Sequence, residues 1–91
     1  MKISEEKKNE FWDYFTSKEM KSYRPYGVTD NCLKKAKPLI WNWNYFWEDV
    51  VVRHGGLESK PEQMDEETFN HSIGNFYGMV FEIMTKYGII K

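Results

Sequence analysis

The chain has 91 residues, of which 41% are hydrophobic, 30% are charged and 18% are aromatic. This length favours one domain over residues 1–91, and the apolar content is too high for a disordered protein. No apolar run approaches the roughly 18 residues that cross a bilayer, and the charges near the start argue against a secretory signal peptide. We therefore expect a cytoplasmic protein that makes no membrane contact.

The charges and the cysteine count narrow the classes of function further. The chain carries 13 Lys and Arg against 14 Asp and Glu, a net charge of −1, whereas nucleic-acid-binding domains usually have a basic excess. All but two of the cations are lysines, so the bidentate phosphate and guanine contacts of arginine are scarce. The single cysteine, Cys32, allows no internal disulfide and no cysteine-based zinc site. We expect neither direct nucleic-acid contact nor a cofactor.

The first helix is predicted over about residues 5–21. Ser4 can cap its N-terminus, and the two glutamates that follow favour a helix start. Large apolar side chains then recur at helical spacing, at Phe11, Trp12 and Phe15. Pro25 and Gly27 form a turn signal that ends this segment.

A second helical segment is expected after Thr29 or Asp30, either of which can serve as its cap. Pro38 interrupts the pattern, because proline lacks an N–H and is tolerated mainly in the first turn of a helix. We therefore expect residues 30–37 to form a short helix or a turn, with the main helix beginning near Pro38.

Residues 38–53 fit a helix better than a strand. Their apolar side chains recur at spacings of three and four, at Leu39, Ile40, Trp43, Phe46, Trp47, Val50 and Val51. Over residues 39–47, Trp and Tyr also alternate with asparagine, as in a strand. The alternation fails at Phe46 whereas the helical stripe continues, so we predict a helix and keep a strand over 39–47 as the alternative.

The third main helix is predicted to follow a connector at residues 58–63. Asp65 can cap it, and the carboxylates of its first turn suit the positive end of the helix dipole. A long apolar stripe extends to Tyr87, where Gly88 ends the helix and the two following isoleucines fold back onto it. The chain is therefore predicted to be all-α, a small three- to four-helix bundle.

Five aromatic residues lie between positions 41 and 47, more than one helix can direct at one core. If three of them face inward, a second set lies on another side of the helix: Trp41, Tyr45, Glu48 and Val52. A chain of this size buries only about two-thirds of its surface, and exposed Trp and Tyr are enriched in protein-binding hot spots. We interpret this set as a partner-binding surface. The alternative is that the first and third helices cover both stripes.

The carboxylates are concentrated in one stretch, which contains Glu58, Glu62, Glu66 and Glu67. This stretch can be a solvated loop and helix start. It can also occupy the cationic groove of a partner by imitating a phosphate backbone, in which case charge complementarity would set the association rate.

Two further patterns in the third helix have alternative explanations. Gly74 and Gly78 each cost about 1 kcal/mol relative to alanine, so we expect them to seat a ring inside the domain. A homodimer seam or a ligand groove is the alternative. Glu67 and His71 share a helix face, as a metal site or an acid–base pair requires. A third ligand would have to come from His54, Glu48, Asp49 or Cys32. We interpret Glu67 and His71 as an exposed pair and predict no metal site.

The sequence contains no Ser, Cys or His in a recognisable catalytic-nucleophile motif, no H-E-x-x-H motif and no phosphate-binding loop. We therefore predict no catalytic residues. Our main hypothesis is a protein-interaction module that binds, and inhibits or regulates, a larger partner such as a nucleic-acid-processing complex. The alternatives are an accessory subunit of a larger enzyme and a small metal-dependent enzyme.

Residues 76–77 and 86–90 resemble a helix end of the nitrile hydratase β subunit over less than a quarter of the chain, which implies only a subunit role.

Overall fold

The computed structural model describes residues 2–53 and 55–90, and this part of the chain is helical without any strand. Three longer helices carry the fold: α1 (Glu5–Phe15), α2 (Asp30–Ile40) and α4 (Glu66–Lys86). The segments between them contain 3-10 turns at Lys18–Tyr23, Gly56–Glu58 and Pro61–Gln63, helix α3 (Asn44–Trp47) and a π-helical turn (Glu48–Val52). The predicted all-α bundle is confirmed. No helix in the described residues is long and apolar enough to cross a membrane.

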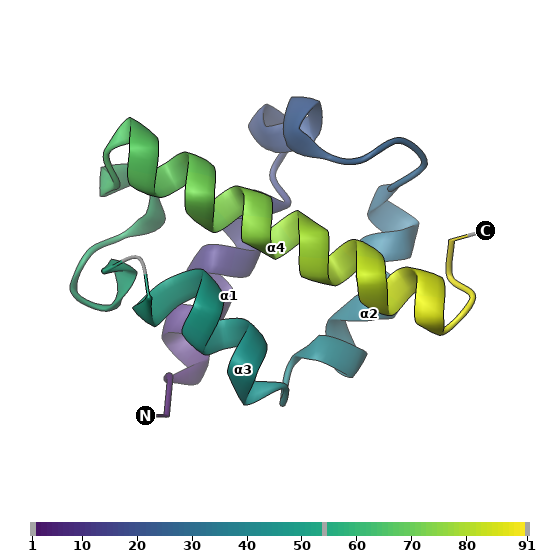
Figure 1. Cartoon of the computed structure of the whole chain (residues 1–91), viewed down its shortest axis with the longest axis horizontal. Coiled ribbons are helices and arrows are strands. Elements are labelled where there is room, and N and C mark those ends of the chain that lie inside the picture. The colour runs from purple at the N-terminus through teal and green to yellow at the C-terminus, as the bar shows by residue number, and fades with distance from the viewer. Residues whose placement is uncertain (1, 54, 91) are drawn as a thin grey trace.

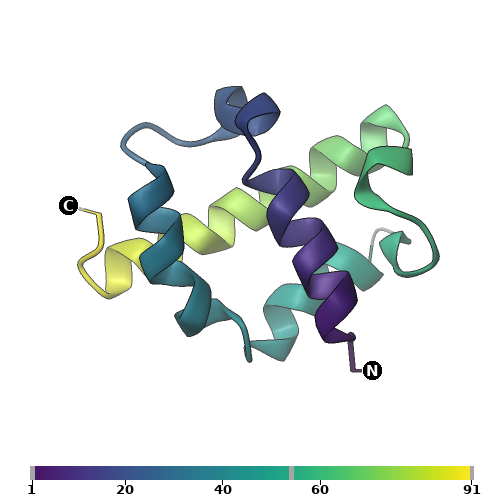
Figure 2. The same cartoon turned by 180° about the vertical axis from the view of Figure 1, so that it is seen from behind.

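Helix α4 is the axis of the molecule. It extends along the longest dimension in Figure 1, and Figure 2 shows α1 and α2 crossing it on the other side. The Cα trace measures 36 × 26 × 18 Å, and the shortest dimension fits two layers of helices packed about 8–10 Å apart. Between the layers lies the Phe76 ring, whose centroid is 5.2 Å from Phe15, 5.4 Å from Trp12 and 5.5 Å from Phe46. The core is therefore built on contacts between aromatic rings.

Each of the three longer helices begins at a side-chain cap that the sequence indicates. Ser4 Oγ accepts the backbone N–H of Lys7 at 3.1 Å, and Thr29 Oγ1 accepts that of Cys32 at 3.2 Å. Asp65 Oδ1 accepts the N–H of Thr68 at 2.8 Å. These bonds satisfy N–H groups that have no partner within the helix.

Helix α1 ends at Phe15, several residues earlier than predicted. Side-chain donors take the last carbonyl groups of the helix. Thr16 Oγ1 donates to the Trp12 carbonyl at 2.6 Å, and the Tyr77 hydroxyl donates to that of Phe15 at 2.6 Å. The Ser17 N–H bonds the Tyr14 carbonyl, three residues back, at 3.2 Å, and residues 18–23 continue as a 3-10 turn.

The predicted helix over residues 38–53 is interrupted and does not begin at Pro38, although residues 44–52 are helical. The strand alternative over 39–47 is wrong. Pro38 lies inside α2, which runs through it to Ile40. The helix then breaks at residues 41–43. Proline is tolerated here because the carbonyl it leaves unpaired, that of Lys34, belongs to an exposed residue that water can reach.

The break after α2 is held by two donors on one carbonyl group. Lys8 Nζ lies 2.9 Å and Trp47 Nε1 lies 3.1 Å from the Trp41 carbonyl oxygen. Trp43 donates its N–H to the Ile40 carbonyl at 2.8 Å, which tightens the turn. The aromatic segment is therefore divided between the end of α2 and the new helix α3.

The end of α4 matches its prediction, but its two internal glycines do not. Gly88 has a positive φ of 72°, and Ile89 folds back so that its N–H bonds the Met84 carbonyl at 2.8 Å. Gly74 and Gly78 are exposed, and a Cβ on either would meet no described residue within 4 Å. The expectation that they seat a ring inside the domain is wrong, because they lie on the outer face of α4.

Candidate functional site

The predicted partner-binding set does not form one patch, because Trp41 lies apart from the other three residues. Its indole is half-buried and donates from Nε1 to Glu5 Oε1 at 2.7 Å, and this hydrogen bond lowers the pKa of the Glu5 carboxyl. Lys37 Nζ lies 4.9 Å from the centroid of the indole ring, within the range of a cation–π contact. Trp41 is therefore held between α1 and α2 by its own chain, and it is not an exposed anchor.

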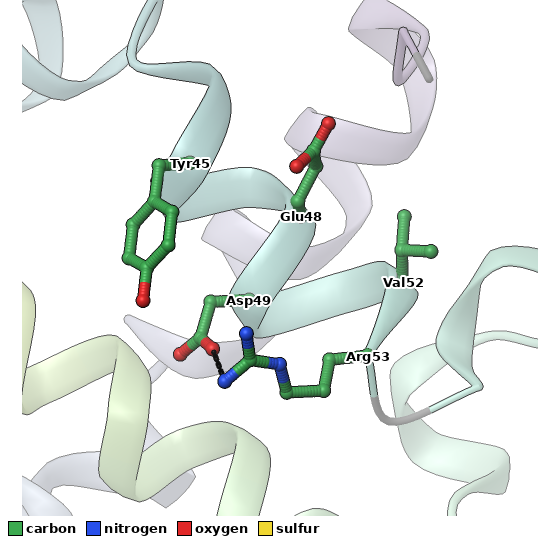
Figure 3. Close-up of a pocket in the computed structure, with 5 residues that line it drawn as sticks. All are labelled: Tyr45, Glu48, Asp49, Val52 and Arg53. Carbon is green, nitrogen blue, oxygen red and sulfur yellow. Dashed lines mark ion pairs between the residues drawn. The ribbon is translucent and has the colours of Figure 1, made fainter.

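Tyr45, Glu48 and Val52 do lie together, in an open hollow that Asp49 and Arg53 complete. Tyr45 is 55% exposed. The hollow has a volume of about 360 Å³, near the lower end of the range of about 300–1,000 Å³ that is typical of ligand sites. In the view of Figure 3, Tyr45, Asp49 and Arg53 extend toward one side of the chain, and Glu48 and Val52 toward the other. We call these five residues the Tyr45 hollow.

A π-helical turn sets the shape of the Tyr45 hollow. Its wide backbone spacing is seen in the bond from the Arg53 N–H to the Glu48 carbonyl, five residues back, at 2.9 Å. Ser72 Oγ from α4 donates to the Val50 carbonyl at 2.6 Å and holds the turn against the core. The turn buries three consecutive residues, Asp49, Val50 and Val51. Single π turns are rare in proteins, and those that occur are often at functional sites.

The buried carboxylate of Asp49 is the most unusual group in this hollow. Asp49 is only 6% exposed, and burying a charge costs free energy unless it is paired and hydrogen-bonded. Arg53 Nη1 lies 2.7 Å from Asp49 Oδ1, yet that oxygen accepts no aligned hydrogen bond from the described residues. The side chain of Arg53 is itself 61% exposed. The buried charge is therefore paired with a cation that lies at the surface.

The four glutamates of the predicted acidic stretch are all exposed, but none of them lines the Tyr45 hollow. Glu58 and Glu62 lie in the connector before α4. Glu66 and Glu67 lie in the first turn of α4, where with two other residues, Asn70 and His71, they line a second, shallow hollow. Their charges are accessible to a partner.

The described residues contain no cluster of three His, Cys, Asp or Glu that could hold a metal ion. Glu67 and His71 are both exposed on α4, in agreement with their interpretation as a surface pair. His54, a candidate third ligand, lies outside the described residues.

Two residues of the hollow, Asp49 and Arg53, do not belong to the partner-binding set predicted from the sequence. Their spacing of four is a visible signal of an ion pair on one helix face. It gives no indication that Asp49 is buried, since that depends on the π turn.

Comparisons with models of protein families, with curated proteins and with solved structures give no match. The chemistry of the Tyr45 hollow is therefore the basis for proposing a function.

Proposed function

We propose that this protein is a small interaction module that binds a larger protein partner and inhibits or regulates it through the Tyr45 hollow. The observation that carries the proposal is the half-exposed Tyr45 ring, which lines one hollow with the Asp49–Arg53 pair. A tyrosine at an interface supplies a large contact area at low entropic cost, and Tyr and Arg are enriched among the residues that dominate binding energy.

The exposed carboxylates support a basic partner. Glu58 and Glu62 precede α4, and Glu66 and Glu67 begin it. Such a group attracts a cationic surface over several ångströms and raises the association rate. A protein whose basic groove binds nucleic acid has a surface of this kind, and the module would inhibit it by occupying that groove.

The test compares two exposed tyrosines. Tyr26 is fully exposed and Tyr45 is 55% exposed, so each can be replaced by alanine with little effect on the thermal unfolding midpoint. Partners from the source cell are identified by crosslinking and mass spectrometry, purified, and titrated with each variant. We expect Tyr45→Ala to weaken binding at least about tenfold, equivalent to about 1.4 kcal/mol, and Tyr26→Ala to bind as the parent does. Equal binding by both variants would overturn the proposal.

A further inference from the structure

We infer that the Tyr45 hollow binds the guanidinium group of an arginine side chain on the partner, which takes the place of Arg53 on the Asp49 carboxylate. This inference rests on the proposed function and states the chemistry that the partner must present. It makes Arg53 an internal stand-in for the ligand.

The first argument is the imperfect neutralisation of Asp49. Its carboxylate is almost completely buried, and its Oδ1 lacks an aligned hydrogen bond from the described residues although Arg53 Nη1 is 2.7 Å away. A guanidinium that approaches from outside is not tethered four residues along the same chain. It can therefore align both of its parallel N–H groups with the carboxylate, which is the strongest geometry for this pair.

The second argument is the aromatic ring at the edge of the same hollow. Tyr45 lies four residues before Asp49, and Figure 3 shows its ring on the same side of the chain as the carboxylate. A planar guanidinium can pair with a carboxylate and stack on an aromatic face at the same time, whereas the compact ammonium of lysine has no planar face to stack. The hollow therefore favours arginine over lysine.

The third argument is the exposure of Arg53. Because its side chain is 61% exposed, it can turn into solvent without opening the core. Its partner Asp49 is buried, and an unpaired buried charge is costly. Arg53 can therefore leave only when another cation takes over the carboxylate. An incoming arginine with better alignment can therefore compete with it.

The experiment uses two blocked peptides, acetyl-Gly-Arg-Gly-amide and acetyl-Gly-Lys-Gly-amide, titrated into the full chain and followed by NMR at low salt. In the Arg53→Ala variant the internal competitor is absent, so we expect the arginine peptide to bind about tenfold more tightly than to the parent. The lysine peptide should bind several-fold more weakly than the arginine peptide. Lys34→Ala makes the same change in net charge on exposed α2 and should leave the affinity unchanged.

Asp49→Asn keeps the shape of the side chain and removes its charge, so saturable binding of the arginine peptide should be lost. The inference is overturned if Arg53→Ala binds the arginine peptide no more tightly than Lys34→Ala, or if the two peptides bind equally. Binding of an anion such as sulfate that is lost in Arg53→Ala would also overturn it, because Arg53 would then be the binding group. The result is independent of the partner titration with Tyr45→Ala, so failure of one is distinguishable from failure of the other. If Asp49→Asn does not fold, the comparison of Arg53→Ala with Lys34→Ala decides alone.

Discussion

At the scale of single residues, one buried cation contributes to the break in the aromatic segment. Lys8 is only 5% exposed. Its Nζ bonds the Trp41 carbonyl, lies 3.4 Å from Glu5 Oε2, and is 5.8 and 5.9 Å from the ring centroids of Trp41 and Trp47. Burial of an ammonium group is tolerated when a carboxylate, a carbonyl and aromatic faces replace its water contacts. Lys8 is therefore a structural residue that helps to hold Trp41 between α1 and α2.

A residue-scale prediction concerns the close packing at Gly56. A Cβ there would lie 2.7 Å from Phe11 Cζ and 3.2 Å from the Val51 carbonyl oxygen, and neither the buried ring nor the backbone can easily move. Overpacking of this kind costs about 1–3 kcal/mol. We expect Gly56→Ala to lower the free energy of unfolding by that amount, as measured by urea denaturation. An unchanged unfolding midpoint would show that Phe11 is free to shift.

At the scale of elements, the helices set by local signals were predictable and those set by distant contacts were not. The cap at Asp65, the stripe of α4 and the end at Gly88 depend on neighbours along the chain, and the structure confirms them. The break after α2 depends on Lys8, which lies 33 residues before Trp41. No periodicity within residues 38–53 carries that information.

The residues of the candidate site also divide into those that local spacing predicts and those that depend on distant contacts. Helical spacing alone places Tyr45, Glu48 and Val52 together, and they do line one hollow. Trp41 was assigned to the same face because the helix was expected to be continuous. Asp49 was missed because a π turn rotates an extra residue toward the core, and that turn depends on packing against α4.

The outer face of α4 gives an element-scale prediction. Gly74 and Gly78 have open space where a Cβ would stand, and alanine is more favourable than glycine inside a helix by about 1 kcal/mol. We expect each substitution to alanine to raise the free energy of unfolding by about that amount, measured by urea denaturation. If instead the substitutions lower stability and the parent is dimeric by light scattering, this face is a seam between two copies.

The cap of α4 gives a pH-dependent prediction. Hydrogen bonds from the backbone and side chain of Thr68 lower the pKa of Asp65 below its usual value. A lowered pKa in the folded state stabilises the protein above the unfolded-state pKa, and this contribution is lost as pH falls through the folded-state value. We expect Asp65→Asn, which keeps the oxygen acceptor, to match the parent more closely in acid than at neutral pH. Thermal midpoints measured from neutral pH into the acid range test this, and a constant difference between the two proteins would contradict it.

At the scale of the whole molecule, the two groups of residues that we propose for partner binding lie on different elements. The Tyr45 hollow belongs to α3 and the π turn, whereas the exposed glutamates belong to the connector and the first turn of α4. Charges act over a distance set by the salt concentration, and contacts in a hollow act only after docking. The two groups should therefore affect different rate constants.

The final prediction separates these rates. Reversing Glu62, Glu66 and Glu67 to lysine should slow association with the purified partner, most strongly at low salt, because the Debye length falls from about 30 Å at 0.01 M to about 8 Å at 0.15 M. Tyr45→Ala should mainly speed dissociation. Stopped-flow mixing over a salt series measures both rates. The control reverses three other exposed carboxylates, Glu6, Asp13 and Glu19, and so makes the same change in net charge elsewhere. If both triple variants associate at the same rate at every salt concentration, net charge alone guides the encounter and the acidic stretch has no directing role.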